Sequence, residues 1–480
     1  MAFSAHEIQP QELSIVSTVA PSLQYSLKSS FSGDTATGPL LQSAVSPWSV
    51  PGSVSAWSVT DTADASSTTA TGRVNASLLP KLTGVALLEQ LSLLPRNDLA
   101  KFVAHNPSSI KQLVSNPPSA RQVASLWSTM DSAGKASWLA VAPGVLGNLE
   151  GVPFGVRDTA NRNYLRESIA DLTSGIKSGI GRGELVAARA RLQMLQQVQA
   201  ALVTPSSASS ATPPQARHLL SLDPSGVGRA AVVVGDLSTA DYVSYLVPGM
   251  FFTVDGQMVD WTVIAQDLNS EQENWVSLLS KTDPSMAGKK VATVAWIGYQ
   301  TPGLTGITSL GLADDGADKL GSSIEGVQAA RAGHEPFVTI VGHSYGSTAA
   351  MIELAKGGVN VDALVLIGSP GSAAQSASDL AVRGDNVYVG EAAWDPVVNT
   401  AFYGSDPGAA SFGAHKMDVS GGVDPITHKL LAPAIGHLGY FDAGTEAMRN
   451  IALISLDRDS LVTNGTTMDA SRTLRWSNLR

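Results

Sequence analysis

The sequence contains no cysteine, so thiol catalysis, thiolate metal sites and disulfide bonds are all excluded. It also lacks any run of about 18 apolar residues that could span a membrane. The first residues, Met1 to Ser30, do not show the basic start and apolar stretch of a secretory signal. We therefore expect a soluble protein without a transmembrane segment, cytoplasmic rather than secreted.

Charged residues are also scarce. They make up only 15% of the 480 residues, and the net charge is -10 without any run of Lys or Arg. This balance argues against nucleic acid or an anionic membrane surface as a partner and favours a small-molecule substrate that is neutral or weakly charged. Hydrophobic residues, at 44%, and 45 glycines predict a globular α/β protein long enough for two or three domains, whose oligomeric state the composition does not predict.

Changes in composition divide the chain into three parts. Residues 1–80 are rich in Ser, Thr, Ala and Gly and predict an irregular N-terminal arm, which its tryptophans would pack onto the body. Residues 81–203 form a helical region, and residues 215–480, which alternate between strand and helix patterns, form the catalytic domain. The Ser- and Pro-rich segment 203–214 is typical of a linker and marks the boundary.

The helical part contains an internal repeat. Phe102 to Arg121 and Trp138 to Arg157 share the spacing of a short helix, a corner marked by proline and a second short helix. Two copies are too few for a solenoid, so we expect a helical cap or scaffold. Apolar residues at helical spacing from Leu185 to Leu202 predict one further amphipathic helix that closes this region.

The C-terminal part predicts a mainly parallel sheet with helices on both faces, because its strands are separated by helical stretches. Apolar, β-branched runs predict strands at 230–234, 243–247, 291–297, 337–341, 363–367 and 387–389. Helical patterns occupy 268–279, 316–330 and 445–454, and another helix opens directly after residue 346.

The motif Gly342-His343-Ser344-Tyr345-Gly346 organises this part. It follows a predicted strand and precedes a helix of small residues, the context in which a G-x-S-x-G motif presents a nucleophilic serine. The turn is strained, and side chains two residues before and after the serine would collide with it, so both positions hold glycine. We therefore predict Ser344 as the nucleophile of an α/β-hydrolase fold. The alternative is a glycine-rich loop with an incidental serine.

A serine hydroxyl needs a base to take its proton, and in this fold the acid and then the histidine follow the serine. Three histidines lie beyond the motif. His415 precedes a segment that resembles the last strand and would lie inside or at the bottom of the sheet, and His428 lies in a polar segment. His437 lies in a glycine-flanked loop before the last helix. We predict His437 as the base, with a buried structural histidine as the alternative.

The acid must orient the imidazole from a loop after a late strand. Asp395 follows the strand 387–389 at a suitable distance and is our prediction, with Asp406 second. Asp424 is followed by proline, as these two are, so the Asp-Pro pair itself does not distinguish them.

Charge that develops on a substrate carbonyl oxygen requires two preorganised N–H donors. The backbone of Tyr345 is one candidate. The other should come from the loop after the strand 243–247, where Pro248 has no N–H. We predict Met250, with Phe251 in reserve. The alternative is a plain Pro-Gly turn.

Large apolar residues at or near the carboxyl ends of strands are candidates for the walls of a substrate pocket. We predict substrate-binding roles for Phe251, Trp296, Tyr299 and Trp394. The Gly- and Pro-rich segments 299–312 and 401–414 are candidates for a lid or pocket rim.

Together these residues resemble a known family, the actinobacterial α/β-hydrolases long catalogued as a domain of unknown function. The resemblance covers most of residues 220–456. It rests on Leu222-Asp223-Pro224, Gly228-Arg229-Ala230, Gly235-Asp236, Val247-Pro248-Gly249-Met250, Gly298-Tyr299, Pro302, Val341 to Ser347, Gly368-Ser369-Pro370-Gly371, Asp395-Pro396, Phe412-Gly413-Ala414, His437 and Tyr440, with Trp138 to Leu165 as a similar helical lead-in. The resemblance implies a Ser-His-Asp hydrolase with Ser344 as nucleophile, Asp395 as acid and His437 as base.

The sequence thus predicts a serine hydrolase that cleaves a carboxylic ester through an acyl-enzyme and needs no cofactor or metal. We expect the ester to be apolar. Two alternatives remain at this stage. One is an acyltransferase or peptidase that uses the same triad, and the other is a catalytically idle interaction protein on the same fold.

Overall fold

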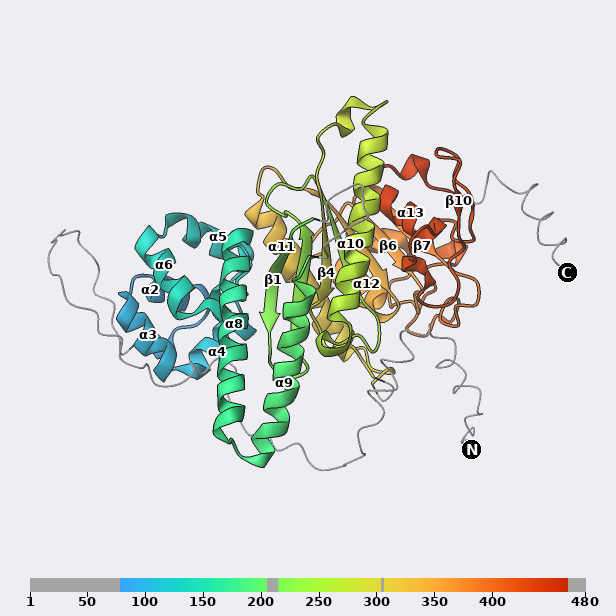
Figure 1. Cartoon of the computed structure of the whole chain (residues 1–480). Coiled ribbons are helices and arrows are strands. Elements are labelled where there is room, and N and C mark those ends of the chain that lie inside the picture. Colours follow the sequence, from blue (N-terminus) through green and yellow to red (C-terminus); the bar gives the residue numbers. More distant parts are fainter. Residues whose placement is uncertain (1–77, 205–214, 304–305, 465–480) are drawn as a thin grey trace, which may run out of the picture.

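A computed structural model describes residues 78–204, 215–303 and 306–464 (Figure 1). Nearly all of the predicted N-terminal arm, residues 1–80, therefore lies outside the described residues. None of the described helices combines the length and the apolar character that are needed to cross a bilayer.

The N-terminal part of the described chain is helical, and its repeat is confirmed. In each copy one helix ends directly before a proline that opens the next, at Pro107 and again at Pro143. Proline suits the first helical position because its missing N–H would have no partner there. The helices are α2 (Gly84–Ser92), α3 (Arg96–His105), α4 (Pro107–Ser115), α5 (Ala120–Thr129), α6 (Ser132–Val141), α7 (Pro143–Leu146), α8 (Phe154–Ser178) and α9 (Arg182–Ala201).

A mainly parallel sheet follows, with the strand order β1-β2-β4-β3-β5-β6-β7-β8. The strands are β1 (Arg217–Asp223), β2 (Arg229–Gly235), β3 (Tyr242–Val247), β4 (Val291–Ile297), β5 (Phe337–His343), β6 (Ala363–Ile367), β7 (Val387–Gly390) and β8 (His415–Lys416). Within this sheet the pairs β1–β2 and β2–β4 are antiparallel, and the other neighbouring strands run parallel. A separate hairpin joins β9 (Gly422–Val423) to β10 (Leu430–Leu431).

The six predicted strands are all present, but β1, β9, β10 and the first part of one helix were not predicted from the sequence. The alternation of β1 is broken by a bulge between Leu219 and Ser221, which hides its period. The helix predicted at 268–279 in fact begins at Val254. The sequence pattern did not reveal its first part, because polar residues such as Gln257 and Gln266 are buried on its inner face and interrupt the apolar stripe.

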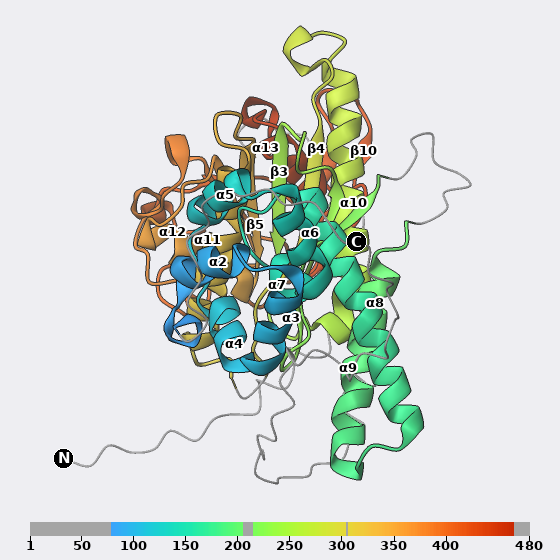
Figure 2. The same ribbon diagram turned by 90° about the vertical axis from the view of Figure 1, so that its left-hand side faces the viewer.

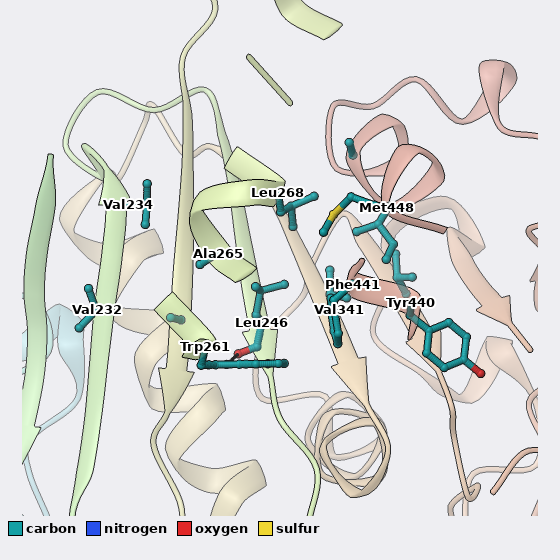
Figure 3. Packing of buried hydrophobic residues seen from close by; sticks show 14 of the residues in the cluster. Val232, Val234, Leu246, Trp261, Ala265, Leu268, Val341, Tyr440, Phe441 and Met448 are labelled. Carbon is teal, nitrogen blue, oxygen red and sulfur yellow. Dashed lines mark hydrogen bonds between the residues drawn. The ribbon is translucent and has the colours of Figure 1, made fainter. Parts of the chain in front are cut away.

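Helices cover both faces of the sheet (Figures 1 and 2). These are α10 (Val254–Leu279) and α13 (Glu446–Ile454) with α9 on one face, and α11 (Gly311–Ala330) and α12 (Tyr345–Lys356) on the other. On the first face, Trp261 of α10 fills the space over β3 and donates from Nε1 to the Leu246 carbonyl at 3.1 Å. Tyr440 and Phe441 extend the same cluster next to Val341 (Figure 3).

The helical part is fastened to the outer edge of β1 by polar side chains. Asn148 forms two hydrogen bonds with the backbone of Leu222, at 2.8 and 3.0 Å. Asn161, fully buried on α8, donates to the carbonyls of Leu219 and Leu220 at 3.1 and 3.0 Å. These contacts supply partners that an edge strand would otherwise lack. Figure 2 shows the resulting arrangement, with α2 to α7 in front of the sheet.

Candidate active site

Ser344 lies on a sharp turn between β5, which ends at His343, and α12, which begins at Tyr345. Its φ is 55° and its ψ is -132°, a backbone conformation that residues other than glycine rarely adopt. A Cβ on Gly342 would lie 2.7 Å from the Cα of Ser347, and one on Gly346 would lie 2.4 Å from the Val247 carbonyl oxygen. Both glycines are therefore required by close backbone contacts, as the motif predicts.

Asp395 and His437 form a hydrogen-bonded pair. The Nδ1 of His437 lies 2.9 and 3.1 Å from the two carboxylate oxygens of Asp395. The carboxylate is fully buried, whereas the imidazole remains 26% exposed. The hydroxyl of Tyr440 donates to Asp395 Oδ2 at 2.7 Å and accepts from the Ala392 amide at 2.9 Å. Asp395 thus has the position and the partners of a residue that orients an imidazole.

Burial alone would raise the pKa of Asp395. The hydrogen bonds from His437 and Tyr440, the charge of His437 and the amide of Val397 outweigh burial and hold the pKa below its ordinary value. Burial and the adjacent Asp395 raise the pKa of Tyr440, so its hydroxyl keeps the proton that it donates. The acid of this pair is therefore ionised at neutral pH.

The serine and the Asp–His pair meet at the carboxyl ends of β5 and β6. The Ser344 amide donates to the Ile367 carbonyl at 3.0 Å. The next residue, Gly368, lies so close to the pair that a Cβ on it would be 2.9 Å from Asp395 Oδ2 and 3.0 Å from His437 Nδ1. The Ser344 side chain is 2% exposed, and its hydroxyl has no hydrogen-bond partner within the described residues. It is free to bond to an imidazole or to a substrate.

His343, inside the motif, holds the base loop in place. Its Nε2 lies 2.7 Å from the His437 carbonyl oxygen and donates to it, and the two rings lie 4.6 Å apart. Burial, followed by the nearby His437, lowers the pKa of His343 to about 3, so the ring is neutral. No role was predicted for His343 from the sequence. Its position directly before the nucleophile was the only feature of the sequence that could have indicated one.

The loop after β3 lies against the nucleophile. A Cβ on Gly249 would be 2.4 Å from the Cβ of Ser344. The amide of Phe251 donates to the Pro302 carbonyl at 3.2 Å, so the reserve candidate is already occupied. The amides of Met250 and Tyr345, in contrast, have no hydrogen-bond partner within the described residues. These two donors remain the candidates for an oxyanion hole.

The four predicted substrate-binding residues are not brought together. Trp296 and Tyr299 are 2% and 1% exposed and stack on each other in the core at 5.8 Å, so neither forms the wall of a pocket. Tyr299 instead donates to the Pro248 carbonyl at 2.7 Å and fixes the loop after β3. Phe251 is half-buried in that loop, and Trp394 is 85% exposed beside Asp395.

The alternative histidines and acids lie elsewhere. His415 is on the short edge strand β8 and is exposed, not inside the sheet as predicted, because no further strand covers that edge. His428 is in the loop between β9 and β10, where its amide donates to the carbonyl of Asp424 at 2.9 Å. The Asp424 carboxylate forms a buried ion pair with Arg449 at 3.0 Å. Asp406 caps a turn by accepting from the Gly408 amide.

No cluster of three or more His, Asp or Glu side chains that could hold a metal ion occurs in residues 78–204, 215–303 and 306–464. The groups that the site does offer are a strained serine, a neutral histidine, an Asp–His pair and two free amides. In combination these groups are suited to attack on a carbonyl carbon and to stabilisation of the resulting oxyanion.

Comparison with known proteins identifies a matching family and uncharacterized relatives. Residues 223–405 match the sequence model of a family described as alpha/beta hydrolase. An uncharacterized protein of Mycobacterium tuberculosis is 27% identical over 413 residues, which cover 75% of this chain and 60% of that protein. This chain thus spans about 60% of the length of that relative. An uncharacterized protein of Mycobacterium bovis is 30% identical over 206 residues, 42% of this chain and 73% of its own.

Similar solved structures include a dienelactone hydrolase from Anabaena variabilis and an esterase from Pyrobaculum calidifontis. The first is 17% identical with a TM-score of 0.29 and covers 52% of this chain and 99% of its own. The second is 13% identical with a TM-score of 0.31 and covers 57% of this chain and 92% of its own. The family match, the mycobacterial relatives and the sheet described above lead to one conclusion: the chain belongs to an actinobacterial family of α/β hydrolases whose function is unknown.

Proposed function

We propose that this chain is a serine hydrolase that cleaves a carboxylic ester. The observation that carries the proposal is the convergence of a strained serine, Ser344, with the bonded pair Asp395 and His437 at the ends of two neighbouring strands. Each of the three residues comes from a different loop of the sheet. Such a group has no evident structural purpose, because a strained serine and a partly exposed imidazole contribute little to stability.

The proposed reaction begins when Ser344 Oγ attacks the ester carbonyl carbon while His437 Nε2 takes the hydroxyl proton. Asp395 holds the imidazole through Nδ1 and stabilises the cation that forms. The carbonyl oxygen becomes an oxyanion between the amides of Tyr345 and Met250. His437 then returns the proton to the leaving alcohol, and an acyl-enzyme remains. A water molecule, deprotonated by His437, releases the acid and regenerates the serine.

An ester is favoured over an amide by the character of the loops that surround the serine. The loop after β3 carries Met250 and two phenylalanines and no charged group. No carboxylate or guanidinium is positioned there to recognise the termini or charged side chains of a peptide. A neutral, apolar acyl group fits such surroundings.

The first test is replacement of the nucleophile. In Ser344→Ala we expect turnover of a chromogenic short-chain ester to fall by at least about a thousandfold, since the acyl-enzyme cannot form. A suitable control is Ser347→Ala, three residues further on. The Ser347 hydroxyl is bonded to the Ser344 carbonyl and to Ser369 at 2.6 and 2.7 Å and is not free to attack.

The same two variants are then treated with a fluorophosphonate probe, which labels an activated serine directly. We expect wild type and Ser347→Ala to be labelled and Ser344→Ala to stay unlabelled. Unchanged turnover in Ser344→Ala would refute the proposal, as would a wild-type chain that the probe does not label.

A further inference from the structure

Three large apolar side chains next to the proposed site face the solvent. Trp394 is 85% exposed, Ile435 60% and Phe402 54%. An apolar side chain exposed singly needs no explanation, but several around one site point to a contact surface. We call these three residues the apolar rim.

Two members of the apolar rim belong to the loops that carry the acid and the base. Trp394 directly precedes Asp395, and Ile435 lies two residues before His437. The two loops are joined by a bridge between Ala393 and Ile435, in which the Gly436 amide donates to the Ala393 carbonyl at 2.9 Å. Each loop of the Asp–His pair therefore exposes one large apolar side chain.

The third member is connected to the nucleophile turn through two aromatic rings. The ring of Phe402 lies 4.8 Å from that of Tyr403, which in turn lies 5.5 Å from the ring of Tyr345. Tyr345 directly follows Ser344, so two ring contacts connect Phe402 to the residue after the serine.

The backbone holds Trp394 in an unusual conformation. Its φ is 62°, in the left-handed region that bulky side chains rarely occupy. Because the ring is 85% exposed, packing of the ring inside the protein does not account for this conformation. A strained residue at the edge of a catalytic site is a recurrent sign of a functional constraint.

The loops at this end of the sheet carry few charged residues. In the segments 248–253, 299–303, 306–310, 368–378, 391–405 and 432–441 the charged residues are Glu391 and Asp395, and the acidic residues Asp379, Asp406 and Asp442 directly follow three of these segments. The Asp395 carboxylate is fully buried, and Glu391 lies 3.5 Å from Lys416. A charged partner would therefore find little to bind on this face. When these loops enter an uncharged, apolar phase, few charged side chains lose their water of hydration.

We propose that the apolar rim inserts into the surface of a water-insoluble neutral ester, so that the substrate is a lipid ester presented at a lipid–water interface. The choice of substrate class rests on the proposed function, but contact with the lipid surface does not. A protein partner is less suited to these residues, since it would cover the site that they border. The net charge of -10 further favours a neutral or zwitterionic surface over an anionic one.

The test measures binding of the full chain to vesicles of zwitterionic phosphatidylcholine by flotation. We compare wild type with Trp394→Asn combined with Ile435→Ser. Asparagine tolerates positive φ, so the backbone at 394 is not forced to change. Val186→Ser, which removes a 72% exposed apolar side chain from α9, is the matched control. Thermal unfolding midpoints establish that all three chains are folded.

We expect the double variant to bind at least tenfold more weakly than wild type and the control to bind as wild type does. Wild-type binding should also persist in high salt, since no ion pair contributes to it. In activity assays, the ratio of turnover on emulsified tributyrin to turnover on a dissolved ester should fall in the double variant.

Equal binding of wild type and double variant, or no binding by wild type, would overturn the proposal. A wild-type chain that ignores vesicles but forms a dimer, lost in the double variant, would also overturn it and assign the rim to a second copy. Fluorophosphonate labelling of wild type separates this test from that of the proposed function. If the wild-type chain binds vesicles but is not labelled, the result supports the proposed contact of the apolar rim with lipid and contradicts the proposed hydrolase function.

Discussion

At the scale of single residues, His343 has a larger part than its place in the motif suggested. One ring nitrogen, Nε2, bonds to the His437 carbonyl, while Nδ1 is buried without a hydrogen-bond partner within the described residues. A protonated ring would be a buried cation beside a second imidazole. The fold therefore keeps His343 neutral, and its role is to position the loop of the base.

This neutrality predicts a dependence of stability on pH. The pKa of His343 is about 3 in the folded chain and near 6.5 when unfolded. As the pH falls below 6.5, the unfolded chain takes up a proton that the folded chain does not, so the free energy of unfolding decreases until about pH 3. At pH 5 the loss from this group is about 2 kcal/mol.

In His343→Gln we expect this loss between pH 7 and pH 5 to disappear, since the amide does not titrate but still donates to the His437 carbonyl. His343→Phe should lose the pH dependence and also lower kcat by roughly 10–100-fold, because the carbonyl has no donor and the base loop can shift. Urea denaturation at both pH values, with kcat at pH 7, makes the comparison. Equal pH dependence in wild type and His343→Gln would contradict the assignment.

At the scale of elements, the loop after β3 owes its shape to a side chain from the loop after β4. The Tyr299 hydroxyl bonds to the carbonyl of Pro248, directly before Gly249, which touches Ser344. The sequence predicts Tyr299 as part of the wall of a substrate pocket. In the structure its hydroxyl instead holds the loop after β3 in place. The loop that offers the Met250 amide is thus held by a residue about fifty positions away.

In Tyr299→Phe we expect kcat for ester hydrolysis to fall roughly 3–30-fold with little change in KM, because a misplaced oxyanion donor weakens only the transition state. The control is Tyr245→Phe. The Tyr245 hydroxyl is equally buried, but it bonds at 3.2 Å to Ser323 on α11, away from the loop. We expect that variant to lose about 1 kcal/mol of stability and to keep its kcat. Equal kcat values for both variants would argue against the proposal that Tyr299 positions the loop after β3 for catalysis.

At the scale of the whole molecule, the helical part and the sheet share buried polar contacts rather than meeting through a loose surface. Besides its bonds to β1, Asn161 donates to the Gly147 carbonyl at 2.9 Å, so one amide ties α8 to the end of α7 and to the edge strand. Arg157 also donates to the Gly147 carbonyl and forms a buried ion pair with Glu150. We infer that the two parts unfold together.

In Asn161→Ala we expect a loss of about 2–4 kcal/mol in the free energy of unfolding, because the carbonyls of Leu219 and Leu220 lose the Asn161 donor, whereas the Gly147 carbonyl keeps its bond from Arg157. Asn163→Ala on the same helix is the control. Asn163 pairs only with Arg166 at the surface, and its loss should cost less than about 0.5 kcal/mol. Urea unfolding followed by fluorescence and by circular dichroism should give one coincident transition. Two separated transitions would show that the parts unfold independently.

Features that depend on neighbours along the chain can be read from the sequence alone. The sharp turn around Ser344 needs glycine at Gly342, whose Cβ would collide with the backbone of Ser347, and buried β-branched runs specify the central strands. Such constraints act over a few residues and leave a readable pattern.

What lies beside that turn depends on the three-dimensional fold. Asp395, Asp406 and Asp424 share the same Asp-Pro context, yet one pairs with His437, one caps a turn and one forms a buried ion pair. The support from Tyr299 and the neutral state of His343 likewise arise from contacts between distant segments. Burial and the neighbours that the fold brings near a side chain decide whether it becomes a hydrogen-bond partner, a core residue or part of the exposed apolar rim. A local sequence pattern contains no information about either.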